Sequence, residues 1–157
     1  MTSAPAGTLR SAARFVASGF GSGYAPVASG TVTSALALAV GLVLMHLSPW
    51  LLAAAALVSV VGGWWAIELA AVEGDPGWVT IDEVAGQWIT LLGLAELSFM
   101  GVLAAFVLFR VLDITKPGPI GWADRWKSPA GVMADDVLAG AIGAVVLRVA
   151  VYAGGGL

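Results

Sequence analysis

The stretch from Val84 to Leu112, VAGQWITLLGLAELSFMGVLAAFVLFRVL, decides how this chain folds. It is apolar over 29 residues except for Gln87, Glu96 and Arg110. As a single helix it would be about 43 Å long at about 1.5 Å per residue, whereas a hydrocarbon core is only about 30 Å thick. We therefore predict a hairpin of two short helices that turns near residues 95–98.

The composition of the whole chain agrees with a membrane location. Of 157 residues, 59% are apolar and only 11% are charged, and the mean hydropathy is +0.94. A soluble domain carries about 25% charged residues, so this chain lacks the polar surface to cover its apolar side chains in water. These values exclude an ordinary soluble protein and a disordered chain. We expect one domain over residues 1–157, with residues 1–18 as a flexible N-terminal segment.

Three further apolar runs complete the predicted fold. Val32–Leu47 and Leu51–Val72 are separated by Ser48-Pro49-Trp50, a break that predicts two antiparallel helices, and Val137–Ala153 forms the last run. The first of these is short for a crossing of about 20 residues. The sequence therefore predicts an all-α, small polytopic membrane bundle with four to five apolar segments, some of them short or half-inserted.

Counting the crossings indicates which polar segments meet. If residues 84–112 form a hairpin, then the N-terminal segment, the 73–83 loop and the 113–136 loop all face one side of the membrane. A single crossing there would separate the loops. Six of the seven basic residues fall on this side, and the positive-inside rule places it in the cytoplasm. They are Arg10, Arg14, Arg110, Lys116, Arg125 and Lys127.

Two adjacent pairs of acids, Asp82-Glu83 and Asp135-Asp136, lie at the edges of these loops, each before an apolar run. Two carboxylates about 4 Å apart repel by roughly 4 kcal/mol at an effective dielectric of 20, so bringing both pairs together favours a bound cation. Oxygen ligands select a hard ion, with Mg²⁺ ahead of Mn²⁺ or Ca²⁺. The sequence therefore predicts an Mg²⁺ site.

Helix capping is the alternative explanation of these acids. Thr80-Ile81-Asp82-Glu83 has the form of a capping box, and Asp135 would serve equally well as an N-cap. For either pair alone the two explanations have equal weight. Adjacent residues on a helix also diverge by about 100°, so each pair is expected to supply one direct ligand and one supporting group.

The counts of cysteine and histidine exclude several mechanisms. The chain has no cysteine, and His46 is its one histidine, so neither a cysteine nucleophile nor a pair of catalytic histidines is available. The basic residues are too few and scattered for nucleic-acid binding. Oligomeric state is left open. The alternative to an enzyme is a small cation-binding membrane protein or transporter, which would carry ionisable groups at mid-bilayer.

Three blocks of sequence resemble the phosphatidylglycerophosphatase A family, and together they span residues 19–140. The blocks are Gly19-Phe20-Gly21-Ser22-Gly23 with Pro26 and Gly30-Thr31; Ile81-Asp82-Glu83-Val84-Ala85-Gly86 with Trp88-Ile89-Thr90; and Phe109-Arg110-Val111-Leu112-Asp113-Ile114-Thr115-Lys116-Pro117-Gly118-Pro119-Ile120 with Trp122, Asp124-Arg125 and Met133 to Gly140. The order of Arg, Asp, Lys-Pro, Asp-Arg and Asp-Asp in the third block is highly specific. Ser29 departs from the family, which usually has proline there, and Ser128-Pro129-Ala130-Gly131 replaces a glycine-rich stretch.

The resemblance implies an Mg²⁺-dependent enzyme of the bacterial inner membrane that removes the terminal phosphate from phosphatidylglycerophosphate, with its site facing the cytoplasm. It implies a membrane-lipid substrate and an all-helical fold.

Roles for individual residues are assigned as hypotheses. Metal-activated water is the best-supported nucleophile. The metal ligands are Asp82, Glu83, Asp135 and Asp136, with Asp113 as a further catalytic candidate. The phosphate-binding candidates are Lys116, Arg125 and Arg110, together with Gly21, Gly23 and Thr31 of the glycine-rich segment. The basic residues have an alternative role in resting on anionic lipid head groups, and Arg110 in pairing with a loop carboxylate.

Overall fold

The computed structural model describes residues 4–154, and every helix or strand in that range is a helix. This confirms the predicted all-α class. In chain order the helices are α1 (Ala4–Ala17), the single-turn 3-10 helix η1 (Ser22–Tyr24), α2 (Ser29–Leu47), α3 (Pro49–Leu69), α4 (Ile81–Leu91), α5 (Phe99–Thr115), α6 (Pro119–Asp124) and α7 (Pro129–Gly154). α1 lies where the sequence indicated only a flexible segment.

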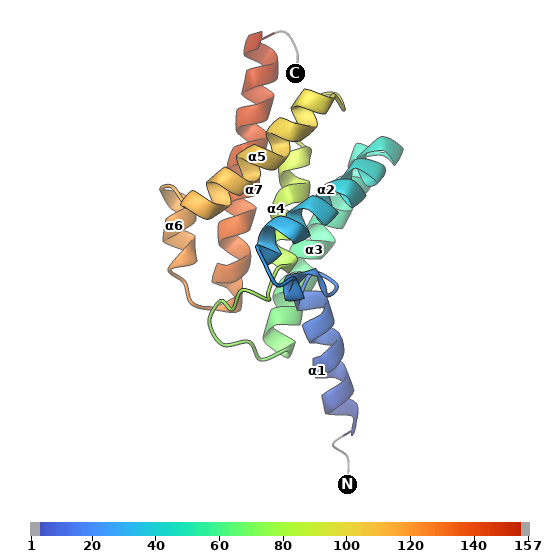
Figure 1. Ribbon diagram of the computed structural model, residues 1–157, viewed down its shortest axis with the longest axis vertical. Helices are drawn as coiled ribbons and strands as arrows, with labels where there is room; N and C mark the ends of the chain where they lie inside the picture. Colours follow the sequence, from blue (N-terminus) through green and yellow to red (C-terminus); the bar gives the residue numbers. More distant parts are fainter. Residues whose placement is uncertain (1–3, 155–157) are drawn as a thin grey trace.

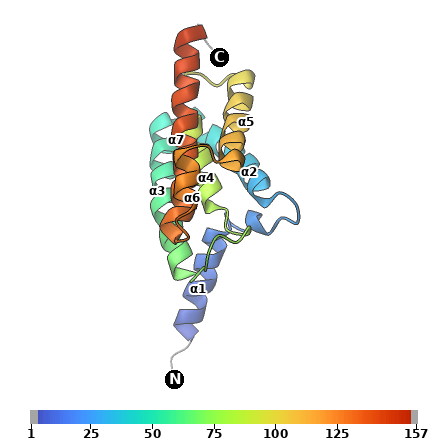
Figure 2. The same ribbon diagram turned by 90° about the vertical axis from the view of Figure 1, so that its left-hand side faces the viewer.

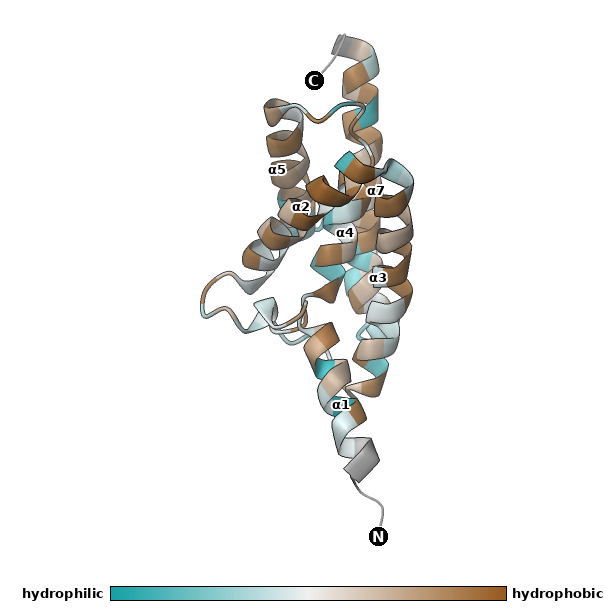
Figure 3. Ribbon diagram, turned by 90° about the vertical axis from the view of Figure 1, so that its right-hand side faces the viewer, coloured by the Kyte–Doolittle hydropathy of each residue, from teal (hydrophilic) through white to brown (hydrophobic). Residues whose placement is uncertain are grey.

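Five of these helices are the predicted apolar segments, but only three of them within residues 4–154 are long and apolar enough to cross a membrane. These are α2 with 19 residues, α3 with 21, and α7, of which Pro129–Ala153 qualifies. α4 has 11 residues and α5 has 17, so both are shorter than a span. Figure 3 shows hydrophobic residues, in brown, along much of α2, α3 and α7. The bundle therefore combines full-length helices with the short ones that the sequence predicted.

The predicted hairpin in residues 84–112 is present. α4 ends at Leu91 and α5 begins at Phe99, so the turn covers residues 92–98. Ser98 caps α5, because its side chain accepts a hydrogen bond of 3.0 Å from the Gly101 N–H. The turn between α2 and α3 is also as predicted: the Ser48 side chain accepts from the Trp50 N–H at 3.3 Å, and Pro49 is the first residue of α3.

α4 is the central element, lying among α2, α3, α5 and α7 (Figures 1 and 2). Its closest approach is to α7, where Gly86 and Gly140 meet. A Cβ atom on Gly140 would lie 2.5 Å from the Gly86 carbonyl oxygen, and one on Gly86 would lie 2.7 Å from the Asp136 carbonyl oxygen. Glycine at both positions lets the two backbones touch, as small residues do between membrane helices. This contact brings the first turn of α4 next to Asp136.

The segment 113–136 differs most from the prediction of a polar loop. It contains α6, and α7 begins at Pro129 rather than at Val137. The reason is a helix start signal in the sequence: the Ser128 side chain accepts from the Gly131 N–H at 3.2 Å, and proline occupies the first helical position. Asp135 and Asp136 therefore lie inside α7 and not before it.

Candidate functional site: a buried acidic cavity

A cavity of about 350 Å³ opens where four parts of the chain converge: the first turn of α2, the segment from the α3–α4 loop into α4, the end of α5, and α7. It confirms that the segments placed on one side by the crossing count lie together. The residues lining it are Ala28, Ser29, Gly30, Thr31, Asp75, Gly77, Val79, Asp82, Glu83, Arg110, Asp113, Ile114, Lys116, Asp135 and Asp136.

Three carboxylates form the centre of this cavity. Asp82, Glu83 and Asp136 each offer one oxygen, and these three oxygens lie within 4.8 Å of one another. Asp82 is only 7% exposed and Asp136 only 2%. Three such oxygens repel strongly when ionised, so the arrangement favours a cation between them. The donor set consists of carboxylate oxygens alone, which suits a hard divalent ion.

Burial perturbs the titration of the α4 pair. It raises the pKa of Asp82 well above the usual value, and the neighbouring charge of Glu83 raises it further. Burial also raises the pKa of Glu83, while a hydrogen bond with Asp82 partly opposes the change. The Glu83 Oε2 atom is buried without a hydrogen-bond partner in the part of the chain that the structure describes. An unpartnered carboxylate oxygen in this position is available to a ligand.

The capping contacts predicted as the alternative explanation are absent at both pairs. Thr80 occupies the N-cap position of α4, yet its side chain makes no capping hydrogen bond. Its own N–H donates to the Ala17 carbonyl oxygen at 3.0 Å, so the return half of a capping box is also missing. Asp135 is the seventh residue of α7, which excludes it as the N-cap. The capping box is therefore wrong for the α4 pair, although both acids do lie in the first turn of the helix, and the N-cap role is wrong for Asp135.

Asp135 contacts a lysine, whereas the other three paired acids form the carboxylate cluster. Lys116 Nζ donates to Asp135 Oδ2 at 2.7 Å and also to Asp124 Oδ1. Partial burial opposes ionisation of Lys116, but these two carboxylates outweigh it and raise the pKa of the lysine. The hydrogen bond from Lys116 lowers the pKa of Asp124. Lys116 thus stays charged at the cavity wall.

Arg110 and Asp113 form a second ion pair in the cavity. Arg110 Nη1 lies 2.7 Å from Asp113 Oδ2 and donates to Ser34 Oγ at 3.3 Å. Asp113 therefore lines the cavity as an arginine partner. The pairing of Arg110 with a carboxylate is the alternative role predicted for it, but this carboxylate lies in the last turn of α5 and not in a loop.

Several of the predicted binding residues lie outside the cavity. Thr31 lines it, but Gly21, Gly23 and Arg125 do not, and Arg125 is exposed. Gly23 has a packing reason: a Cβ atom there would lie 2.1 Å from the Trp78 carbonyl oxygen. Gly21 adopts a backbone φ of 94°, which favours glycine.

Two polar residues and one glycine near the site, all named in the sequence analysis, were given no individual role there. Ser29 Oγ donates to the Gly77 carbonyl oxygen at 2.6 Å and so ties the start of α2 to the α3–α4 loop. A Cβ atom on Gly30 would lie 2.2 Å from Glu83 Oε1, so only glycine leaves room for this carboxylate. Gln87, one turn beyond Glu83, is fully buried, with an amide that has no partner among the described residues. Only the position of Ser29 and Gly30 at a helix start was a usable signal.

Comparison with known proteins finds one family model and three relatives that match most of the chain. The family model described as phosphatidylglycerophosphatase A matches residues 15–151. A protein of Escherichia coli K12 named phosphatidylglycerophosphatase A is 39% identical over 137 residues, covering 84% of this chain and 79% of that protein. A Haemophilus influenzae Rd protein of the same name is 38% identical over 141 residues, covering 87% and 86%.

A third relative carries a different name. A Bacteroides thetaiotaomicron protein, named provisionally as a phosphatidylinositol-3-phosphatase, is 38% identical over 144 residues, covering 86% of this chain and 91% of that protein. No solved structure matches the chain.

Proposed function

The chain belongs to the phosphatidylglycerophosphatase A family, and we propose that it hydrolyses the terminal phosphate monoester of phosphatidylglycerophosphate to give phosphatidylglycerol and phosphate in phospholipid synthesis. The observation that carries this proposal is the buried group of three carboxylates with a charged lysine at the same cavity wall. Phosphate hydrolysis requires neutralisation of the negative charge on the phosphate, which a bound cation and a nearby positive side chain provide.

Mg²⁺ is the ion that these residues fit best. Asp82, Glu83 and Asp136 would hold it, and the chain has no cysteine to select a softer metal. His46 lies in the last turn of α2, at the opposite end of that helix from the cavity. When bound, Mg²⁺ supplies Lewis-acid neutralisation of phosphate charge and lowers the pKa of water.

Lys116 is the phosphate ligand that we assign on this chain. It lines the cavity, and its ion pairs with Asp124 and Asp135 hold the ammonium group in place and charged. Asp135, which the sequence placed among the metal ligands, then acts by positioning Lys116. Asp113 positions Arg110 in the same way, through their ion pair. Two cationic side chains are in this way orientated by carboxylates that need not touch the metal.

The first turn of α2 is the second element that we assign to the phosphate. Ser29, Gly30 and Thr31 line the cavity, and the first N–H groups of a helix attract anions. Arg125 is exposed outside the cavity, and we assign it to attraction of anionic head groups at the membrane surface.

The location that we propose is the bacterial inner membrane, with the cavity facing the cytoplasm. Arg110 and Lys116 lie at the cavity, and Arg14 lies near the α3–α4 loop through its contact with the Trp78 ring at 4.5 Å. Basic residues concentrated at one end of the spans indicate the cytoplasmic side. Exposed Ile114 at the cavity edge gives a lipid substrate an apolar surface beside its phosphate.

Phosphate release from purified protein in detergent micelles tests the proposal. Phosphatidylglycerophosphate and phosphatidylinositol 3-phosphate are compared at equal surface concentration, with Mg²⁺ and after chelation, because the relatives carry both names. We expect Mg²⁺-dependent release from phosphatidylglycerophosphate, lost in Asp136→Asn and retained in the control Glu96→Gln, an exposed carboxylate in the α4–α5 turn.

Two other results would contradict it. Faster release from phosphatidylinositol 3-phosphate would reassign the substrate. No release from either lipid, together with metal-stimulated cation flux in vesicles, would favour the transporter class instead.

A further inference from the structure

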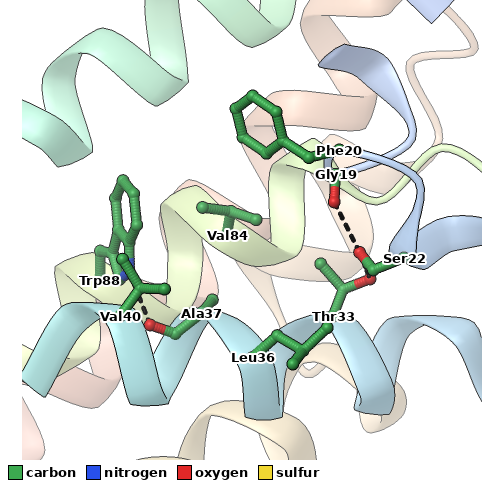
Figure 4. A pocket seen from close by; sticks show the side chains of 9 residues that line it. All are labelled: Gly19, Phe20, Ser22, Thr33, Leu36, Ala37, Val40, Val84 and Trp88. Atoms are coloured by element: carbon green, nitrogen blue, oxygen red, sulfur yellow. Dashed lines mark hydrogen bonds between the residues drawn. The ribbon is translucent and has the colours of Figure 1, made fainter. Parts of the chain in front are cut away.

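Two apolar cavities lie beside α4, apart from the acidic cavity. One, of about 350 Å³, lies between α2 and α4, and the other, of about 260 Å³, lies between α3 and α4. Phe20, Val84 and Trp88 line both of them and form their common wall. Together the two cavities make a branched groove, and we call it the α2–α3 groove. Figure 4 shows its first branch, with Phe20 and Trp88 at the two ends and Val84 of α4 between them.

Every polar side chain that lines the groove already has a partner within the protein. Ser22 and Thr33 share a hydrogen bond of 2.6 Å, Ser59 donates to the Ala56 carbonyl oxygen at 2.8 Å, and the Trp88 indole N–H donates to the Ala37 carbonyl oxygen at 2.7 Å. No hydroxyl or indole N–H is left to bind a polar ligand. The groove therefore fits a hydrocarbon occupant.

The rim of the groove faces the bilayer. Leu36 and Val40 on α2 and Val58 on α3 are exposed, and both helices are long and apolar enough to cross a membrane. At this depth the surrounding medium is lipid acyl chains and not water. A partner helix is about 10 Å across, so one turn of it fills roughly 400 Å³. Neither branch holds that much. Two narrow branches that share one wall match the two chains of a phospholipid.

Phe20 lines both branches of the groove. Its backbone φ is 59°, which is unfavourable for an aromatic residue, and its ring contacts Phe15 edge-on at 5.9 Å. The ring is 60% exposed. Strained backbone conformations occur most often at binding and active sites. The strain at Phe20, an exposed residue that lines both cavities, is therefore consistent with a binding site here.

The groove is separate from the acidic cavity. Gly30 and Thr31 line the acidic cavity, whereas Thr33, less than one turn further, lines the groove. No residue that lines the groove also lines the acidic cavity. We propose that the α2–α3 groove binds the two acyl chains of one resident phospholipid, which is distinct from the lipid that the acidic cavity hydrolyses.

Photolabelling in reconstituted vesicles tests this site. The probe is phosphatidylethanolamine with a diazirine at the end of one acyl chain, a lipid that has no phosphate monoester and is therefore no substrate. We expect labels on Val84 and Trp88. Val84 is only 6% exposed, so a chain running along the outer surface does not reach it. Labels confined to outward residues such as Val43 and Leu57 would overturn the proposal.

Blocking variants complete the test. Val40→Trp fills the first branch, and Gly62→Leu fills the second, where a Cβ atom on Gly62 meets nothing within 4 Å. The matched control is Val43→Trp, on the same helix, exposed and outside the groove. We expect loss of the Val84 label in the two blocking variants and its retention in the control, with lipid hydrolysis retained in all three.

Two results would refute the assignment. Equal Val84 labelling in Val40→Trp and Val43→Trp would show that the label does not come from a chain bound in the groove. Competition of the label by phosphatidylglycerophosphate, with hydrolysis lost in Val40→Trp alone, would show that the groove holds the substrate.

Discussion

The two acidic pairs look alike in sequence and locally in structure, yet they have different surroundings. Asp82 Oδ1 accepts from the Glu83 N–H at 3.1 Å, and Asp135 Oδ1 accepts from the Asp136 N–H at 3.0 Å. Both members of the α4 pair enter the three-carboxylate cluster. The α7 pair divides: Asp136 joins the cluster, and Asp135 binds Lys116.

The difference arises from where each pair lies on its helix. Asp82 and Glu83 lie in the first turn of α4, which is surrounded by the start of α2, by α5 and by α7, so side chains 100° apart both reach the cavity. Asp136 faces α4 across the Gly86–Gly140 contact, while Asp135 points toward Lys116. A motif of two adjacent acids therefore does not by itself assign the same role to both residues.

The largest effect is expected from changing the two acids of the α7 pair one at a time. Asp136→Asn removes a proposed metal ligand and should lower kcat/KM by about 10²-fold or more, since a metal supplies several kcal/mol of transition-state stabilisation. Asp135→Asn should cost only about 10-fold, as a supporting residue does. Steady-state hydrolysis with a Mg²⁺ titration measures both. Equal losses would show that the pair acts as one unit.

The next largest effect is expected at the contact that joins the two pairs. Gly140→Val places atoms against the Gly86 backbone, and should destabilise the fold by about 1–3 kcal/mol while separating Asp136 from Asp82. Thermal unfolding in detergent and hydrolysis should fall together. Gly62→Ala is the control, because its Cβ atom meets nothing within 4 Å. Normal activity in Gly140→Val would show that the close approach is not required.

A smaller effect is expected in the coupling between Lys116 and Asp135, which tests whether Asp135 positions Lys116 for hydrolysis. Lys116→Met and Asp135→Asn should each weaken hydrolysis, and the double variant should lose less than the sum, with a coupling of about 0.5–3 kcal/mol. Asp136→Asn combined with Lys116→Met should show weaker coupling. Strict additivity for the Lys116 and Asp135 changes would contradict the positioning role.

The smallest effect is expected in the pH dependence of stability. Burial raises the pKa of Asp82 and Glu83, so without metal the folded protein binds more protons than the unfolded chain between the usual and the raised pKa. Stability is then highest below this window and falls as the pH rises through it. Mg²⁺ should reduce the decline, since it stabilises the ionised carboxylates. Thermal unfolding at several pH values, with chelator or with Mg²⁺, measures the change. A flat profile with chelator would contradict burial of the α4 pair.

The pattern of apolar runs was enough to predict much of the architecture. The length of residues 84–112 required a turn, which lies at residues 92–98, and Ser48-Pro49 marked the α2–α3 turn. The crossing count then placed the acidic pairs on one side. The apolar pattern did not predict α6 or the early start of α7. The segment 113–136 is rich in polar residues and proline and was therefore predicted as a loop, although Ser128 and Pro129 form a helix start.

The sequence by itself determined the helical class, the membrane location of the apolar runs and the convergence of the acidic loops, because hydrophobicity and segment length act locally along the chain. Only the tertiary structure decided that Asp135 serves Lys116, that Asp113 serves Arg110, and that Gly30 makes room for Glu83. The direction of a side chain in a bundle depends on how neighbouring helices are rotated against each other. That rotation is set by close contacts such as Gly86 with Gly140, between residues far apart in the chain.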